Sequence, residues 1–152
     1  MNKKIVYIAS DHGGYDTKIG LAKLLEKDGY EIKLYGAQDK TTSVSYSEIG
    51  IEFAKLITKN KDSDKNYYVA LCGSGIGISI ALNRFKNIRC ARVTNEEEAK
   101  LSKMHNNANI LCFGGRFINP EQAYKMFNVW KNATFEGGRH VARIAKLEEI
   151  GE

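Results

Sequence analysis

Residues 67–79 have the sequence Tyr-Tyr-Val-Ala-Leu-Cys-Gly-Ser-Gly-Ile-Gly-Ile-Ser, a short apolar run followed at once by three alternating glycines. The run Tyr67–Cys72 is aromatic and aliphatic and predicts a buried strand. The glycines permit a tight turn, and the apolar residues after them predict a short helix over Gly77–Phe85. A strand that passes through a glycine loop directly into a helix is typical of an α/β fold.

The same alternation of strand and helix continues on both sides of this segment. Further strands are expected at Ile5–Ala9, Glu31–Tyr35, Arg89–Val93 and Ile110–Phe113, and further helices at Thr17–Lys27, at Glu48–Lys59, up to Met104, from Pro120 onward and at Arg139–Glu149. Thr94 and Glu97 have the spacing of a capping box and are expected to begin the helix that ends near Met104. Because no linker or repeat interrupts the pattern, residues 1–152 are predicted to form one domain. Its expected class is α/β, a Rossmann-like three-layer fold with a five-stranded parallel sheet and helices on both faces.

Composition narrows the class of protein. The chain has 152 residues, of which 43% are hydrophobic and 27% charged, as in an ordinary globular domain. No apolar stretch approaches the roughly 20 residues of a membrane span, and no signal-peptide cleavage site follows the first apolar run. The net charge of +5 suits an anionic ligand but is too small to indicate nucleic-acid binding. A cytoplasmic protein without membrane or nucleic-acid contact is therefore expected.

The carboxyl ends of the strands are where ligands bind in parallel sheets. Gly73, Gly75 and Gly77 lie there, and their backbone N–H groups at a helix start could hold a phosphate or an oxyanion. The spacing matches neither a dinucleotide-binding fingerprint nor a P-loop. A tight turn that merely packs well is the competing interpretation, and the loop alone does not decide between them.

The three cysteines are odd in number and widely spaced, so neither a disulfide framework nor a zinc motif is indicated. Cys90 and Cys112 lie inside apolar runs and are expected to be core residues. Cys72 differs because it ends its strand next to a helix start, where a thiol becomes a usable base or nucleophile.

Asp11 and His12 follow the first predicted strand, at the same sheet edge as Cys72. An N-cap for the next helix is the structural alternative for Asp11. His105 and Asn106 follow the fourth predicted helix, where they either end that helix or provide proton transfer and an amide donor.

Arg139 and Arg143 open the last predicted helix with a spacing of four residues, which places both guanidinium groups on one face. Two cations near a helix N-terminus are unfavourable, so they suggest an anionic guest such as a phosphate. An ordinary basic surface remains the alternative.

Taken in order, these segments resemble the type B ribose-5-phosphate isomerase family, which also includes the galactose-6-phosphate isomerase subunits. The similarity runs nearly end to end and is strongest at Asp11-His12-Gly13-Gly14, Cys72–Ser79, His105-Asn106, Phe113–Arg116 and Glu136–His140. One departure concerns Ser45-Tyr46-Ser47, where the family usually has Asp-Tyr-Pro. Tyr46 is kept as a sugar-facing residue, while the loss of Pro is expected to loosen this loop.

The resemblance implies a catalytic role for four side chains. Cys72 is implied to be the base that moves a proton between C1 and C2 of a sugar phosphate. Ser74 is implied to move protons between the two oxygens. Asp11 and His105 are implied to open the furanose ring. Neither a cofactor nor a metal is implied.

The substrate-binding residues come from the same resemblance. The amides of Gly73, Gly75 and Gly77, together with Asn106, are implied to stabilise an enediolate. The implied phosphate ligands are His12, Arg116, Arg139 and Arg143, and the arginines of the last helix are contributed across a dimer interface.

The expected function is therefore the interconversion of ribose 5-phosphate and ribulose 5-phosphate by a homodimer, or a dimer of dimers, with shared active sites. The open alternatives are an isomerase of allose or galactose 6-phosphate, and a sugar-phosphate binding module without catalysis. A nucleic-acid binder is a third, and salt-dependent binding to DNA would reveal it.

Overall fold

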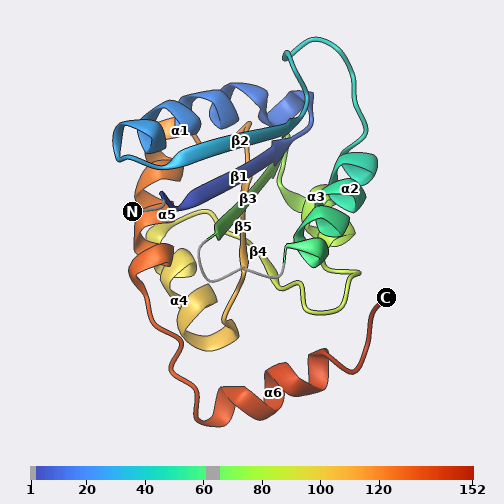
Figure 1. The fold of residues 1–152 in the computed structure, drawn as a ribbon, viewed down its shortest axis with the longest axis vertical. Helices are drawn as coiled ribbons and strands as arrows, with labels where there is room; N and C mark the ends of the chain where they lie inside the picture. Colours follow the sequence, from blue (N-terminus) through green and yellow to red (C-terminus); the bar gives the residue numbers. More distant parts are fainter. Residues whose placement is uncertain (1–2, 61–65) are drawn as a thin grey trace.

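The computed structural model describes residues 3–60 and 66–152, and its centre is a parallel sheet with the strand order β2-β1-β3-β5-β4 (Figure 1). The five strands are β1 (Ile5–Ser10), β2 (Glu31–Gly36), β3 (Asn66–Cys72), β4 (Cys90–Arg92) and β5 (Ile110–Gly114). Every paired neighbour is parallel, which confirms the predicted sheet. All carboxyl ends consequently lie at one edge of the sheet.

Helices cover both faces of the sheet, as the sequence predicts. The helical elements are η1 (His12–Gly14, a 3-10 turn), α1 (Tyr15–Lys27), α2 (Tyr46–Lys59), α3 (Ile76–Leu82), α4 (Glu96–Asn106), α5 (Pro120–Asn132) and α6 (Arg139–Leu147). Helix α5 packs between α1 and α4 on one face, and α2 packs against α3 on the other. The strands supply both layers in alternation, with Val6 and Ile8 in the first core and Tyr7 and Ala9 in the second.

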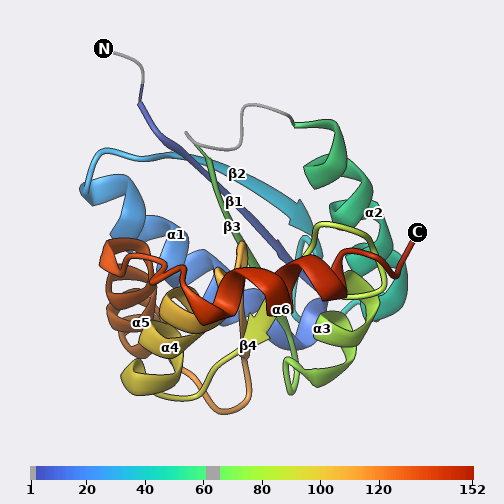
Figure 2. The same cartoon turned by 90° about the horizontal axis from the view of Figure 1, so that it is seen from below.

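Helix α6 belongs to neither layer. It lies across the amino end of the sheet, near the end of α4 and away from the strand tips (Figures 1 and 2). Across residues 3–60 and 66–152, no helix is both long and apolar enough to cross a membrane.

The predicted capping box at Thr94 and Glu97 is wrong by one residue. Asn95 is the N-cap, and its side chain accepts a hydrogen bond of 2.8 Å from the backbone N–H of Glu98. The Glu98 carboxylate in turn accepts from the hydroxyl and the backbone N–H of Thr94, each at 2.7 Å. These bonds lower the pKa of Glu98 from its ordinary value. Asn, Ser and Thr all cap helices well, so the sequence offered two competing starts.

Candidate active site

The ends of β1, β3 and β5 lie side by side at the carboxyl edge. The backbone N–H of Asp11 donates to Leu71 O at 3.3 Å, and that of Gly115 donates to Cys72 O at 2.8 Å. The strand register pairs Cys72 with Gly114. The structure thereby brings together three of the segments singled out in the sequence.

The glycine loop after β3 is held in a defined conformation. Gly75 has a φ of 79°, and a Cβ added there would lie 2.8 Å from the carbonyl carbon of Phe113. The carbonyl groups of Gly73 and Ser74 accept hydrogen bonds of 3.0 Å, from the backbone of Arg116 and the Nε of Arg92 respectively. Arg92 was not identified from the sequence, because a lone arginine at the end of a short strand has no distinctive pattern.

Cys72 lies at the base of this loop with 4% of its surface exposed. Its Sγ accepts a hydrogen bond of 3.1 Å from the backbone N–H of Gly75, which stabilises negative charge on the sulfur. Ser74 Oγ accepts from the backbone N–H of Ile76 at 3.1 Å. Both side chains that the resemblance implies for proton movement therefore belong to one loop.

The other two cysteines are core residues, as expected. Cys112 is buried, and its Sγ donates to the carbonyl oxygen of Gly75 at 3.2 Å. The neighbouring Cys90 thiol and burial raise the pKa of Cys112 well above its ordinary value. Cys112 consequently stays protonated, and its hydrogen bond to Gly75 stabilises the glycine loop.

Asp11 and His12 connect the site to the segment before α2. Asp11 is buried and caps η1, with Oδ1 accepting from the backbone N–H of Gly14 at 3.2 Å. His12 Nδ1 accepts from the backbone N–H of Val44 at 3.2 Å. Asp11 is thus a structural cap, which does not prevent its second carboxylate oxygen from serving a ligand.

Ser45-Tyr46-Ser47, which differs from the Asp-Tyr-Pro usual in the family, keeps the start of α2 capped. Ser45 caps α2 by accepting from the backbone N–H of Glu48, and its Oγ is 2.7 Å from Ser47 Oγ. The exposed ring of Tyr46 reaches the glycine loop, because a Cβ added at Gly77 would lie 2.6 Å from Tyr46 Cε1. The serines therefore retain the capping function that Asp would perform, and Tyr46 remains next to the site.

Lys18 is a charged group near the site that the sequence did not reveal. It is 1% exposed, and its Nζ donates to Tyr35 O at 2.9 Å and to Ala37 O at 2.7 Å. Burial lowers the pKa of Lys18 to about 8, and the charge of Asp11 opposes this shift. The sequence shows only a lysine within an amphipathic helix, which usually reaches solvent.

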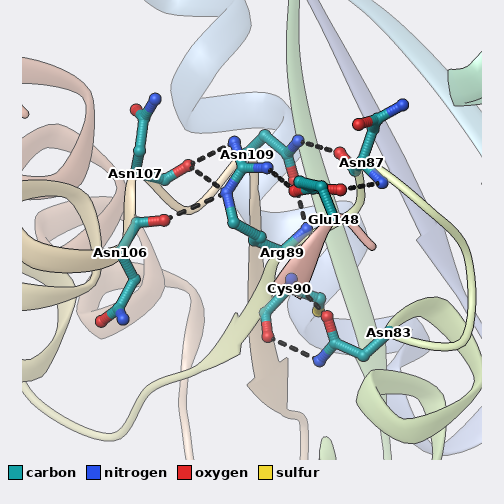
Figure 3. Close-up of polar contacts among 8 residues, drawn as sticks. All are labelled: Asn83, Asn87, Arg89, Cys90, Asn106, Asn107, Asn109 and Glu148. Carbon is teal, nitrogen blue, oxygen red and sulfur yellow. Dashed lines mark hydrogen bonds and ion pairs between the residues drawn. The ribbon is translucent and has the colours of Figure 1, made fainter. Parts of the chain in front are cut away.

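His105 and Asn106 lie in the last turn of α4, at the opposite edge of the sheet. The Nε of Arg89 donates to Asn106 O and Asn107 O, each at 3.1 Å (Figure 3). Arg89 directly precedes β4, and its carbonyl accepts from the backbone N–H of Asn109 just before β5. The amino ends of two strands thus hold this turn.

Helix α6 is attached at the same edge. The carboxylate of Glu148 pairs with the guanidinium group of Arg89 (Figure 3), and the backbone N–H of Glu136 donates to Met104 O at 3.0 Å. Arg139 and Arg143 are exposed on α6, so neither is committed to the core.

The candidate residues therefore form two groups. Asp11, His12, Tyr46, the Cys72–Gly77 loop and Arg116 lie toward the carboxyl edge, whereas His105, Asn106, Arg139 and Arg143 lie toward the amino edge. Ile110 and Gly114 mark the two ends of β5, and four residues of strand span about 13 Å. Among the described residues, no hydrogen bond or ion pair joins the two groups.

Comparison with known proteins gives a consistent set of similarities. Residues 6–147 match the model of the family described as Ribose/Galactose Isomerase. The chain is 33% identical over 142 residues to a protein of Mycoplasma genitalium named probable ribose-5-phosphate isomerase B, covering 93% of this chain and 92% of that protein.

Two solved structures share the fold over nearly the whole chain. A ribose 5-phosphate isomerase from Thermotoga maritima has a TM-score of 0.90 and 34% identity, with 98% of this chain and 100% of that chain covered. Ribose-5-phosphate isomerase B from Mycoplasma genitalium with bound ribulose-5-phosphate has a TM-score of 0.86 and 32% identity, with 95% and 94% covered.

Proposed function

The chain belongs to the ribose/galactose isomerase family and is an aldose–ketose isomerase, and on this premise we propose that it interconverts ribose 5-phosphate and ribulose 5-phosphate. The observation that carries the proposal is the Cys72 thiol, which receives a hydrogen bond from the backbone N–H of Gly75 inside a glycine loop. The ribulose 5-phosphate bound to the Mycoplasma genitalium relative supports the choice of substrate.

The reaction needs a base, an oxyanion site and an anchor for the phosphate. In the proposed mechanism, the Cys72 thiolate removes the proton from C2 of the open-chain aldose and returns it to C1. Ser74 moves the proton between the two substrate oxygens. The amides of Gly73, Gly75 and Gly77 stabilise the enediolate, because fixed dipoles need no reorganisation when charge develops.

Ring opening and phosphate binding use the remaining groups. His105 and Asp11 transfer protons to and from the ring oxygen and the anomeric hydroxyl, and Asn106 assists the loop amides at the enediolate. The proposed phosphate ligands are His12, Arg116, Arg139 and Arg143. Holding the phosphate far from the reacting carbons positions the substrate for proton transfer.

The proposed site is composed of two copies of the chain. The support for this is the division of the candidate residues between opposite edges of the sheet, which leaves Cys72 without His105 in one chain. Exposed apolar side chains occur at both ends: Ile76 and Ile80 on α3, and Val141 and Leu147 on α6. A two-fold homodimer would cover both patches and complete two identical sites.

A turnover panel tests the substrate. Ribose 5-phosphate, allose 6-phosphate and galactose 6-phosphate are compared at equal enzyme concentration, and the highest kcat/KM is expected with ribose 5-phosphate. A higher kcat/KM on a hexose phosphate would reassign the substrate, and saturable binding without turnover on every sugar would reduce the chain to a binding module.

A further inference from the structure

Two of the three histidines of the chain meet one carboxylate at the end of α4. The rings of His105 and His140 are stacked, with centroids 4.6 Å apart and planes 17° from parallel. Glu136 Oε1 lies 3.6 Å from His105 Nε2 and 3.4 Å from His140 Nε2. A single carboxylate oxygen is thus within reach of two imidazole nitrogens.

Backbone contacts and a glycine turn bring these three side chains together. The backbone N–H of Glu136 donates to Met104 O, which holds Glu136 beside the last turn of α4. Gly137 and Gly138 both have positive φ, at 69° and 55°, and reverse the chain before α6. The reversal brings His140 back onto Glu136, four residues earlier. A side chain at either glycine would be strained, so the turn depends on glycine.

His140 is the observation that points to a missing partner. It is 5% exposed, and its Nε2 is buried with no hydrogen-bond partner among the described residues. A buried nitrogen without a partner is unfavourable, and this one lies 3.4 Å from a carboxylate oxygen to which it makes no hydrogen bond. If Nε2 carries a lone pair, the two atoms repel each other unless a cation lies between them.

Two of the three donor spacings fit a tetrahedral metal ion. Two ligand atoms at about 2.1 Å from a tetrahedral zinc ion lie about 3.4 Å apart. The two nitrogen–oxygen distances have this value within a few tenths of an ångström, and all three donors lie within 4.8 Å of one another. The parallel rings require His105 to turn so that its lone pair points at the ion, and its side chain is 36% exposed and has room to do so.

We propose that His105, Glu136 and His140 form a binding site for Zn²⁺, with the fourth coordination position open. Two imidazoles and one carboxylate suit zinc among the divalent ions of cells. Arg139 lies between Glu136 and His140 in the sequence, and its positive charge opposes a dication and weakens binding. Zinc coordination occupies the His105 nitrogen and therefore inhibits ring opening. This inhibition rests on the proposed function, whereas the metal binding does not.

Binding is measured with Co²⁺ on protein without a histidine tag, because four-coordinate cobalt absorbs strongly in the visible range. Wild type is expected to bind one Co²⁺ per chain, and added Zn²⁺ is expected to displace it. E136Q and H140Q are each expected to weaken binding by at least about 100-fold, the upper end of the cost of losing even a supporting partner. E149Q removes an exposed carboxylate on the same segment and is expected to bind cobalt as wild type does.

Two further variants test Cys72 and His12 as alternative metal ligands. C72A and H12Q are expected to keep the visible band, since neither residue belongs to the cluster. Loss of the band in C72A, an unchanged affinity in E136Q, or no visible band in wild type would each overturn the site. If H140Q does not fold, the solvent-exposed E136Q decides the question.

The activity arm separates the two proposals. Zn²⁺ is expected to reduce turnover of ribose 5-phosphate in wild type and much less in E136Q, with EDTA restoring the wild-type rate. Cobalt binding without any isomerisation would support the metal site and contradict the proposed function. Isomerisation that zinc does not inhibit, despite cobalt binding at the cluster, would remove the inhibitory role.

Discussion

Cys72 ends β3 at the carboxyl edge of the sheet, whereas His105 lies in the last turn of α4 beside the amino ends of β4 and β5 (Figure 1). The length of β5 alone separates these edges by about 13 Å. In the proposed mechanism Cys72 and His105 act on neighbouring atoms of one sugar, and one chain holds them too far apart to do so. Under the proposed mechanism, assembly of two chains is therefore a condition of catalysis.

Removing the thiol tests the proposed base. Cys72→Ala is expected to lower kcat by about 10²–10⁴-fold, the usual contribution of a positioned acid or base, while substrate affinity changes little. The matched control is Cys90→Ala, which removes a core thiol that contacts no part of the proposed mechanism. Isomerisation by Cys72→Ala at close to the wild-type rate would remove Cys72 from the mechanism.

His105 is expected to matter only where a ring must open. His105→Ala should lower turnover of ribose 5-phosphate by about 10²-fold or more, with a smaller loss on an acyclic aldose phosphate. The acyclic substrate is an internal control for folding and for assembly. Equal losses on both substrates would show that His105 has another role.

Lys18 predicts a stability change with pH. Its pKa is about 8 in the folded chain against 10.5 ordinarily, so the unfolded chain binds more protons between these pH values. Stability therefore rises with pH across this window, by at most about 1.4 kcal/mol per pH unit. The cost of burying the charge is fully present below pH 8.

The measurement compares the free energy of unfolding of wild type and Lys18→Met at several pH values. The free energy of unfolding of wild type minus that of Lys18→Met is expected to rise from pH 8 to pH 10, because methionine does not titrate. Lys23→Met changes an exposed lysine on the same helix and should give a difference that does not vary with pH. If the difference between wild type and Lys18→Met stays constant or falls as pH rises, the pKa given for Lys18 is wrong.

The Arg89–Glu148 pair is expected to hold α6 against the end of α4. A double-mutant cycle with Arg89→Met and Glu148→Gln should give a coupling energy of about 1 kcal/mol or more, because both groups are half-buried and charged. The exposed pair Lys146–Glu149 should couple by less than about 0.5 kcal/mol. Urea unfolding supplies both values, and similar couplings for the two pairs would refute the anchoring role.

The sequence predicted the architecture well because its signals are local. Alternating strands and helices, the glycine loop after Cys72 and the proline at the start of α5 each depend on a few neighbouring residues. The capping error at Thr94 arose because Asn95 offers an equally good cap one residue later.

The parts that the sequence could not give depend on distant contacts. Nothing near Lys18 shows that the carbonyls of Tyr35 and Ala37 enclose its amino group, and nothing near His140 shows that α4 brings His105 to it. The sequence shows the motif Glu136–His140, yet its glycine turn and the buried His140 nitrogen appear only in three dimensions.

Subunit complementation tests the central claim, that each site combines two chains. Three inactive variants are prepared: Cys72→Ala, His105→Ala, and Arg139→Ala with Arg143→Ala. Equal amounts of two variants are unfolded together and refolded, and native mass spectrometry confirms that mixed dimers form. Random pairing makes half of the dimers mixed, and a shared site leaves one of their two sites intact.

Mixing Cys72→Ala with either of the other two variants is therefore expected to restore about a quarter of the wild-type activity. Mixing His105→Ala with the double arginine variant should restore none. One chain supplies His105, Arg139 and Arg143 to a site, so every site carries one of the two defects. Activity that stays at the level of the separate variants in the first two mixtures, with mixed dimers present, would mean that each site is built within one chain.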